Sequence, residues 1–316
     1  MSYFPSRTLI DNANSRRATE LKKALASASS SLTMESMEGN LVMDTFEQAL
    51  KHVNNYITIN KQQITKAEEA YEEVGQYLVQ ELKWNERDIY IVPQGSAATQ
   101  TLIRSPRNKN FDIDAVCRVN IQRIDLANPV DFFNIIGNCL KKRYGEDVAA
   151  KNRCWNINLV GEGFYLEFTP SVPLGEMTDE QKVNMESMKY QATFEPNYSA
   201  TALSVVDNKE QSWKPSNPEG FTQWVKETAA LSILTKPGKE VAVLSAEARV
   251  DPVPDQEIPD GDILKLAIRL FKRHRDMCVY RNIFKSKYQP ISVILVTLIT
   301  GIYEGLATTE AKYHNV

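Results

Sequence analysis

Residues 111–120, FDIDAVCRVN, form the segment that most constrains how this chain can fold. The segment is rich in β-formers and alternates apolar with other residues, which is typical of a strand with one buried face. Residues two apart on a strand point to the same face, about 6.5–7 Å from each other, so Asp112 and Asp114 share a face. Carboxylates this close raise each other's pKa at a cost in stability. The pattern therefore predicts that a cation belongs beside them.

A Gly-Ser turn lies just upstream of this strand. Residues 88–94, DIYIVPQ, predict a short strand that leads directly into Gly95 and Ser96, after which AATQTLIR begins as a helix. Backbone amides at such a start attract phosphate, glycine lets the backbone approach closely, and the serine hydroxyl adds a donor. A basic loop follows and is expected near a bound polyphosphate. Its cations are Arg104, Arg107 and Lys109.

A third carboxylate lies on a later strand, where Glu167 alternates with Leu166 and Phe168 in FYLEFTP. Acids from neighbouring strands can flank one or two divalent ions, and ligation by oxygen alone suits Mg²⁺ or Mn²⁺. Each signal taken alone has a plainer interpretation, because exposed acids and Gly-Ser turns are common and glutamates often pair with surface cations. The order of the signals along the chain, Gly-Ser, then D-x-D, then a later acid, is what favours a catalytic site.

The remaining pattern predicts strands and helices in the first part of the chain and mainly helices after it. A stripe of apolar residues predicts a helix over residues 61–82, and an Asn-Pro start with a glycine stop predicts another over 128–145. CWNINLV and FYLEFTP predict two further strands joined by a turn at residues 161–163. Beyond residue 173, helices are expected from residue 218 and from residue 263.

Two helices of the second part carry specific expectations. In the helix that begins near residue 263, the residues expected to face the core are Leu264, Ala267, Ile268 and Phe271. The last helix, residues 291–307, is apolar but interrupted, and its apolar run is shorter than a membrane span needs. We therefore expect it to be a core helix. Trp213 and Trp224 are expected to pack in the protein rather than to stack on a base.

The chain has 316 residues, of which 42% are hydrophobic and 24% charged, which is a globular composition and enough for two lobes. Its net charge is -3, so we expect no stable complex with nucleic acid, because proteins that coat nucleic acid are basic. The four cysteines match no zinc spacing. With no secretory signal in view, they are expected to be reduced thiols of a cytoplasmic protein.

Three segments follow from these patterns. We expect an N-terminal helical or irregular segment over residues 1–60, a catalytic core over 61–175 and a helical lobe over 176–316. Because the sequence stops soon after its last apolar helix, we expect the helical lobe to be truncated at its C-terminus.

The motifs QGS, FDIDAV and LEFTP together resemble the core of the DNA polymerase β-type nucleotidyltransferases. SWKPSNPEGFTQW and LKLAIRLFKRHRD, with QPISVIL after it, narrow the resemblance to the bacterial cGAS/DncV-like enzymes, the CD-NTases, over residues 71–304. The resemblance implies an α+β fold with a polymerase β-like nucleotidyltransferase lobe, a mainly helical second lobe and an active site in the cleft between them. It also implies an enzyme that makes a cyclic di- or trinucleotide second messenger from nucleoside triphosphates, with ATP as the expected substrate, in CBASS anti-phage defence.

The resemblance also assigns roles to individual residues. Asp112 and Asp114 would be catalytic and bind Mg²⁺ or Mn²⁺, and Glu167 falls at the third metal-binding acid, where aspartate is the commoner residue. The positions assigned to the donor triphosphate are Gln94, Gly95, Ser96, Lys272 and Ser292. The partners implied are nucleoside triphosphates, a product-sensing effector protein and a regulatory partner, with no membrane.

Other functions stay open at this point. The nearest is an enzyme of the same fold that adds nucleotides to RNA 3′ ends or to protein side chains. A catalytically silent nucleotide-binding sensor is the second, and the complete acidic trio argues against it. A scaffold protein with accidental motifs would leave the paired acids unexplained.

Overall fold

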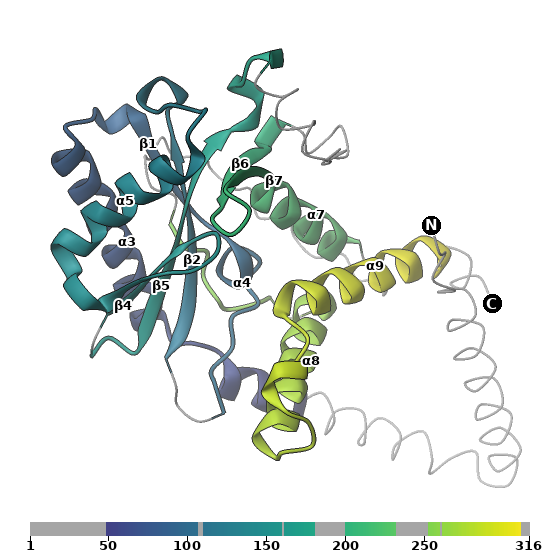
Figure 1. Ribbon diagram of the computed structural model, residues 1–316. Coiled ribbons are helices and arrows are strands. Elements are labelled where there is room, and N and C mark those ends of the chain that lie inside the picture. The colour runs from purple at the N-terminus through teal and green to yellow at the C-terminus, as the bar shows by residue number, and fades with distance from the viewer. Residues whose placement is uncertain are drawn as a thin grey trace, which may run out of the picture. The chain divides into compact units, whose positions relative to one another are not determined.

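The fold is taken from a computed structural model that describes residues 49–106, 110–159, 161–180, 200–231, 252–259 and 261–310 (Figure 1). The chain divides into two compact units, residues 1–56 and residues 57–316. All the elements named below belong to the second unit.

A mixed seven-stranded sheet is the centre of the second unit (Figure 1). The strand order is β1-β2-β5-β4-β3, and β6 extends the sheet from β5 and carries β7. β2 and β5 run parallel, and every other pair is antiparallel. The strands are β1 (Ile89–Pro93), β2 (Phe111–Val119), β3 (Val148–Ala150), β4 (Trp155–Leu159), β5 (Phe164–Pro173), β6 (Leu203–Asp207) and β7 (Ser212–Ser216).

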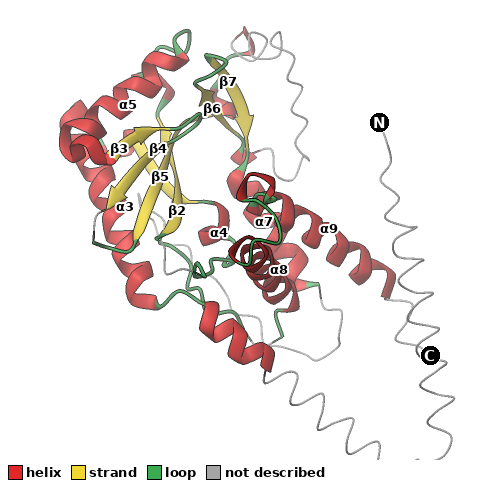
Figure 2. Ribbon diagram, turned by 60° about the horizontal axis from the view of Figure 1, so that its bottom comes forward, coloured by secondary structure: helices red, strands yellow, loops and turns green. Residues whose placement is uncertain are grey.

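Helices cover the sheet and form a second group beside it (Figure 2). α3 and α5 pack on the sheet, and α7, α8 and α9 contact one another. The helices are α3 (Lys61–Leu82), α4 (Gly95–Ala98), α5 (Pro129–Tyr144), α7 (Pro218–Ala230), α8 (Ile263–Tyr280) and α9 (Ser292–Glu310). This mixture of a sheet with helices confirms the predicted α+β class.

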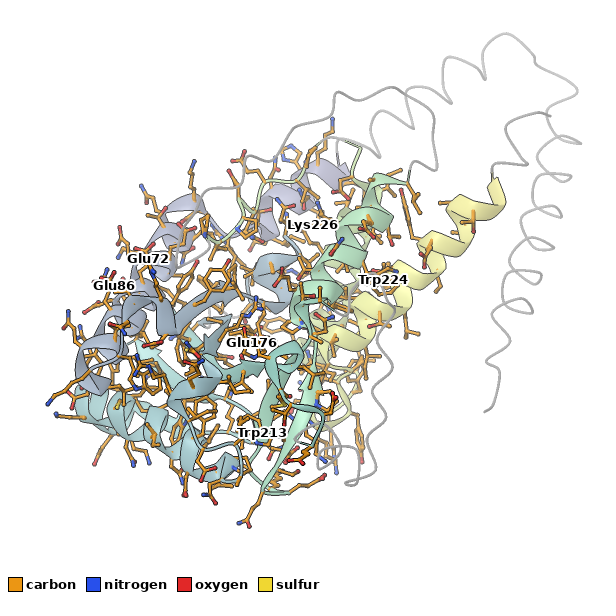
Figure 3. All side chains as sticks on the ribbon, turned by 90° about the horizontal axis from the view of Figure 1, so that it is seen from above. Glu72, Glu86, Glu176, Trp213, Trp224 and Lys226 are labelled. Carbon is orange, nitrogen blue, oxygen red and sulfur yellow. The ribbon has the colours of Figure 1, made fainter. Side chains whose placement is uncertain are left out.

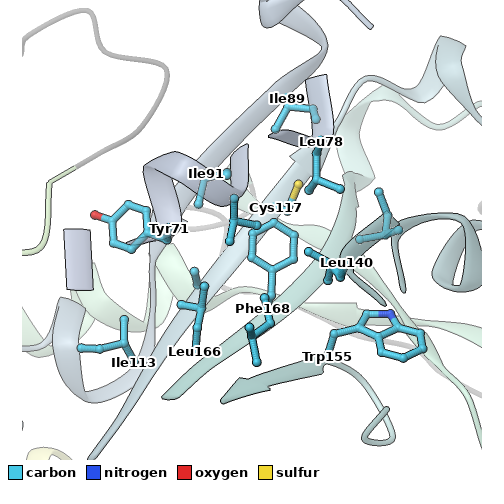
Figure 4. Close-up of a cluster of buried hydrophobic side chains, with 14 of the residues drawn as sticks. Tyr71, Leu78, Ile89, Ile91, Ile113, Cys117, Leu140, Trp155, Leu166 and Phe168 are labelled. Carbon is cyan, nitrogen blue, oxygen red and sulfur yellow. The ribbon is translucent and has the colours of Figure 1, made fainter. Parts of the chain in front are cut away.

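The main core lies between the sheet and helices α3 and α5 (Figure 4). Ile113 and Cys117 of β2 point into it, beside Leu166 and Phe168 of β5 and Tyr71 of α3. Strand alternation then turns the intervening residues of β2 to the opposite face of the sheet. Because Ile113 and Cys117 pack in the core, Asp112 and Asp114 lie on the face of the sheet that is turned away from α3 and α5.

The β6–β7 hairpin was not predicted from the sequence, which indicated mainly helices beyond residue 173. All five residues of β6 are buried, so the strand lacks the alternation by which a half-buried strand is recognised. The sheet therefore continues past residue 175.

α8 buries a different face from the one predicted. Leu264 and Ile268 are buried as expected, but Phe271 is 56% exposed. Two cations are buried instead, with Lys265 7% and Arg269 0% exposed. The prediction for Phe271 was wrong because α8 contacts the sheet lobe through polar bonds as well as apolar packing.

α9 is only partly the core helix that the sequence predicted. Val296 and Tyr303 are buried against α7 and α8. The opposite face is open, with Ile294 48%, Leu298 57% and Ile302 53% exposed. No helix in the described ranges has both the length and the apolar character needed to cross a membrane.

All four cysteines are free and buried, as expected for reduced thiols.

Candidate active site

The Gly-Ser turn joins β1 to α4 and is fixed against β2. The Gln94 amide donates a 2.8 Å hydrogen bond to the Asp114 carbonyl. Gly95 has φ +60°, and a Cβ at this position would lie 2.5 Å from Asp114 Oδ2. Only glycine combines this backbone conformation with so close a carboxylate. The position of the Gly-Ser turn is therefore fixed relative to Asp114.

The three predicted acids lie on one face of the sheet. In the parallel pairing of β2 with β5, Asp114 is opposite Glu167 and Asp112 is opposite Tyr165. Asp112 is exposed, and Asp114 and Glu167 are half-buried. Burial, followed by the negative charges of Asp112 and Glu167, raises the pKa of Asp114 to about 8. A raised pKa of this kind is typical of neighbouring carboxylates that lack enough positive charge nearby to stabilise their ionised forms.

A basic residue that the sequence did not single out holds the third acid. Lys151, between β3 and β4, forms an ion pair with Glu167 Oε1, and the Cys154 thiol donates to Glu167 Oε2 at 3.5 Å. Burial lowers the pKa of Lys151, but the hydrogen bond and charge of Glu167 outweigh it, so that the pKa is raised. The Lys151 ammonium also lies 5.5 Å from the ring centroid of Tyr165. Its signal in the sequence was its place just ahead of the strand that pairs with Glu167.

The acids fit a divalent cation in part. In the part of the chain that the structure describes, no three His, Cys, Asp or Glu side chains converge closely enough to hold a metal ion. Glu167 is held in the ion pair with Lys151. Asp112 and Asp114 fit a hard cation, because they offer oxygen ligands in a region that lacks positive charge. The predicted set of three is therefore not preformed and requires Lys151 to release Glu167.

Lys272 reaches from α8 to the Gly-Ser turn. Its Nζ donates 2.7 Å hydrogen bonds to Ser96 Oγ and to the Thr101 carbonyl. The side chain is 4% exposed. Burial lowers its pKa to about 8, although the nearby Asp112 charge opposes the shift. The structure thus brings together two residues, Ser96 and Lys272, that the sequence analysis assigned to one triphosphate.

The other predicted triphosphate residues have partners of their own. Ser292, the first residue of α9, accepts a 3.1 Å hydrogen bond from Arg275, which lies one turn beyond Lys272 on α8. The Gln94 side chain donates to Thr169 Oγ1 of β5 at 3.3 Å, which directs it along the sheet. Arg104 is exposed. Arg107 and Lys109 lie outside the described residues.

Two further residues that the sequence analysis missed position the turn from behind. Arg269 of α8 donates to the Gln100 carbonyl at 2.8 and 3.0 Å, to the Gln256 carbonyl, and to Thr58 Oγ1 at 3.0 Å. Gln256 bonds to the Ala97 carbonyl at 3.0 Å. Burial lowers the pKa of Arg269 to about 10. The residues after the Gly-Ser turn are thus held by partners more than 150 positions away.

Comparisons with known proteins bear on the fold of the chain. No protein-family model matches the chain. A c-di-GMP synthase of Roseivirga ehrenbergii is 22% identical over 273 residues, which are 85% of this chain and 64% of that relative. The chain thus spans less than two thirds of the relative's length.

Two solved structures are similar in fold. The CD-NTase CdnG of Bradyrhizobium diazoefficiens, in complex with GTP, has a TM-score of 0.53 at 19% identity, covering 81% of this chain and 70% of that one. The CdnE cyclic dinucleotide synthase of Elizabethkingia meningoseptica, with GTP and Apcpp, has a TM-score of 0.50 at 13% identity, covering 80% and 83%. These similarities confirm the resemblance predicted from the sequence: the chain has the polymerase β-like fold of the cGAS/DncV-like CD-NTases.

Proposed function

We propose that this chain is a nucleotidyltransferase that joins nucleoside triphosphates into a cyclic dinucleotide. The observation that carries the proposal is the contact of Lys272 with Ser96, beside a turn whose glycine lies against Asp114. A cation, a hydroxyl and a carboxylate pair from three separate segments meet there, which is the equipment that phosphoryl transfer needs.

Each group of the site has a part in the proposed transfer. Ser96 and Lys272 would hold and neutralise the triphosphate of the donor nucleotide, since the Lys272 ammonium can contact phosphate oxygens as it now contacts Ser96 Oγ. Asp112 and Asp114 would bind Mg²⁺ or Mn²⁺ through their carboxylate oxygens. Glu167 would become a third ligand once its ion pair with Lys151 is broken. A bound divalent ion would supply positive charge at the leaving pyrophosphate and lower the pKa of the attacking ribose hydroxyl.

Alignment is the second contribution of the protein. The Asp114 carboxylate lies where a side chain at Gly95 would begin, so a nucleotide held on the turn would lie next to the acids. Holding both reactants in the reactive geometry contributes several kcal/mol to catalysis, typically about 7–11 kcal/mol when orientation is good. Two such transfers, the second within one linear dinucleotide, would close a ring.

The substrate and the biological role are parts of the proposal. ATP was the expectation from the sequence, and GTP stands beside it, because the CdnG and CdnE structures contain GTP and the relative is named a c-di-GMP synthase. We propose anti-phage signalling as the role, with the product recognised by an effector protein and a further protein partner regulating synthesis.

The experiment is incubation of the protein with all four nucleoside triphosphates and Mg²⁺ or Mn²⁺, followed by phosphatase treatment and mass spectrometry. A cyclic dinucleotide survives the phosphatase because it has no terminal phosphate. The Asp112→Asn/Asp114→Asn double variant should give no such product while keeping its circular dichroism spectrum.

Failure to detect any phosphatase-resistant dinucleotide from wild type in either metal would contradict the proposal. Label transferred to added RNA or to the protein itself would instead support the alternative nucleotidyltransferase.

A further inference from the structure

A cavity lies at the other end of the sheet from the acids. Its volume is about 710 Å³, which is within the range of small-molecule sites. It is bounded by the chain after β2, the chain after β5 and the turn between β6 and β7. β2 and β5 are parallel, so both reach the cavity with their C-terminal ends. About 17 Å of strand separates Asp114 from the end of β2 at Val119.

The walls of the cavity are mostly apolar. The apolar lining includes Ile121, Ile124, Leu126, Met177 and Trp213. Trp213 is rigidly placed, because its indole Nε1 donates a 2.7 Å hydrogen bond to the Leu126 carbonyl and its ring lies 5.7 Å from that of Phe132. It is 7% exposed, so it is a packed wall rather than a base-stacking surface.

The charges of the lining all have one sign. Asp125 and Glu176 are its acidic members, and among the lining residues, all of them in the described ranges, none is basic. Figure 3 labels Glu176 and Trp213, the acidic and the aromatic members of this lining. Asp125 already accepts bonds from the Ala127 amide and the Asn128 side chain, whereas Glu176 is exposed. Such a site disfavours phosphates and other anions and favours a cation.

A buried hydroxyl in the lining has no hydrogen-bond partner among the described residues. Ser212 lines the cavity, is 3% exposed, and its Oγ makes no hydrogen bond within the part of the chain that the structure describes. Leaving a buried hydroxyl unsatisfied costs about 1–3 kcal/mol. A serine hydroxyl reorients by rotation about a single bond, so a polar group entering the cavity can satisfy it.

We propose that this cavity is a second ligand site, separate from the acids of β2, for a small organic amine with an apolar body. The apolar part would pack on Trp213 and Met177, the ammonium would lie toward Glu176, and the amine or a neighbouring polar group would bond to Ser212. The site is independent of the proposed nucleotidyl transfer, because no acid of β2 or residue of the Gly-Ser turn lines it.

The test uses a matched pair of probes, 3-phenylpropylamine and 3-phenylpropionate, which differ in the sign of their charge. Saturation-transfer NMR on the full chain should show millimolar binding of the amine and about tenfold weaker binding of the carboxylate, because attraction to Glu176 becomes repulsion. Equal binding of the two probes, or no binding of the amine, would overturn the proposal.

Two variants assign the binding to this cavity. Ala127→Trp fills it from an exposed position of the lining, so it should abolish amine binding. Glu176→Arg reverses the charge at an exposed position and should reverse the preference for the two probes. Glu146→Arg, the same change at an exposed glutamate outside the lining, should leave amine binding as in wild type. Amine binding that survives both cavity variants would contradict the proposal.

Discussion

Asp114 carries the clearest sign of an incomplete site at the scale of a single residue. Its carboxyl is crowded by Asp112 and Glu167, and its pKa is raised to about 8, first by burial and then by those charges. The chain retains an arrangement that costs stability when Asp114 ionises. A bound cation would remove that cost, which is the physical reason for assigning the acids to function.

Asp114→Asn should therefore raise the melting temperature, and more so at high pH. Because the folded-state pKa lies above the ordinary value of 3.8, the stability linked to protonated Asp114 is present below about pH 4 and is lost as the pH rises to about 8. Asparagine does not ionise, so the variant avoids this loss. The melting temperature of the variant relative to wild type should rise across that window, by about 2–4 °C for each kcal/mol.

Thermal melts of wild type and Asp114→Asn at several pH values, without metal, measure this difference in melting temperature. Asp179→Asn, at an exposed position, is the control and should show no such trend. If the difference in melting temperature between Asp114→Asn and wild type stayed constant with pH, the pKa of Asp114 would not be raised in the folded protein.

Gly95→Ala should cost more stability than Gly145→Ala. The two glycines have nearly the same positive φ, +60° and +61°, but only at Gly95 does a Cβ meet another atom, Asp114 Oδ2 at 2.5 Å. For alanine the left-handed region costs about 1–2 kcal/mol, and the clash with Asp114 Oδ2 is additional at Gly95. Urea unfolding of the two variants measures the difference. Equal costs would show that the turn does not press against the acid.

At the scale of an element, α8 is held against the segment that follows the Gly-Ser turn through buried polar groups. Lys265, Arg269 and Lys272 are each less than 10% exposed, and each bonds to the segment that follows the Gly-Ser turn. A helix docked in this way fixes the position of Lys272 relative to Ser96.

Arg269→Met should destabilise the protein by about 2–4 kcal/mol, because it leaves the buried acceptors on Gln100 and Gln256 without their donor. Arg281→Met is the control, since Arg281 is exposed at the C-terminal end of the same helix and should cost less than about 0.5 kcal/mol. Chemical denaturation of both variants decides the point, and similar costs would refute the buried role of Arg269.

α9 should tolerate polar substitution on one face only. Leu298→Gln, at a position 57% exposed, should change stability by less than about 0.5 kcal/mol. Val296→Gln, at a position 3% exposed, should cost about 2–4 kcal/mol, because it buries an amide in the contact with α7 and α8. The same denaturation experiment measures both. Equal losses would mean that α9 is surrounded by protein.

Local signals account for the elements that could be predicted from the sequence. α3 and α5 were predicted by their apolar stripes and ends, and β2 and β5 by alternation in FDIDAV and FYLEF. The β6–β7 hairpin was not predictable in this way, because its burial comes from pairing with β5. The polar face of α8 was missed because lysine and arginine are ordinarily assigned to solvent, whereas here they are buried by contacts with distant parts of the chain.

The same division holds for the candidate site. Asp112 and Asp114 could be placed on one face from the two-residue period of a strand alone. That Glu167 shares this face depends on the parallel pairing of β2 with β5, which only the structure gives. The ion pair of Lys151 with Glu167 and the contacts of Arg269 with the residues after the turn depend on tertiary structure. The place of Lys151 just ahead of a strand was the one signal for the first, and no pattern in the sequence indicated the second.

At the scale of the whole second unit, the sheet carries two candidate sites, one at each end. The acids and the Gly-Ser turn lie where β2 and β5 begin, and the apolar cavity lies where they end. The helices beyond residue 217 complete only the first of these, through Lys272.

The central claim is that Asp112 and Asp114, with Lys272 opposite them, take up a divalent ion together with a nucleoside triphosphate. The most direct measurement is calorimetric titration of Mn²⁺ into wild type and into Asp112→Asn/Asp114→Asn, each with and without a non-hydrolysable GTP or ATP analogue. Wild type should bind Mn²⁺ more tightly with the analogue present, and the double variant should lose that uptake. Equal Mn²⁺ uptake by the two proteins, or no uptake by wild type, would contradict the account.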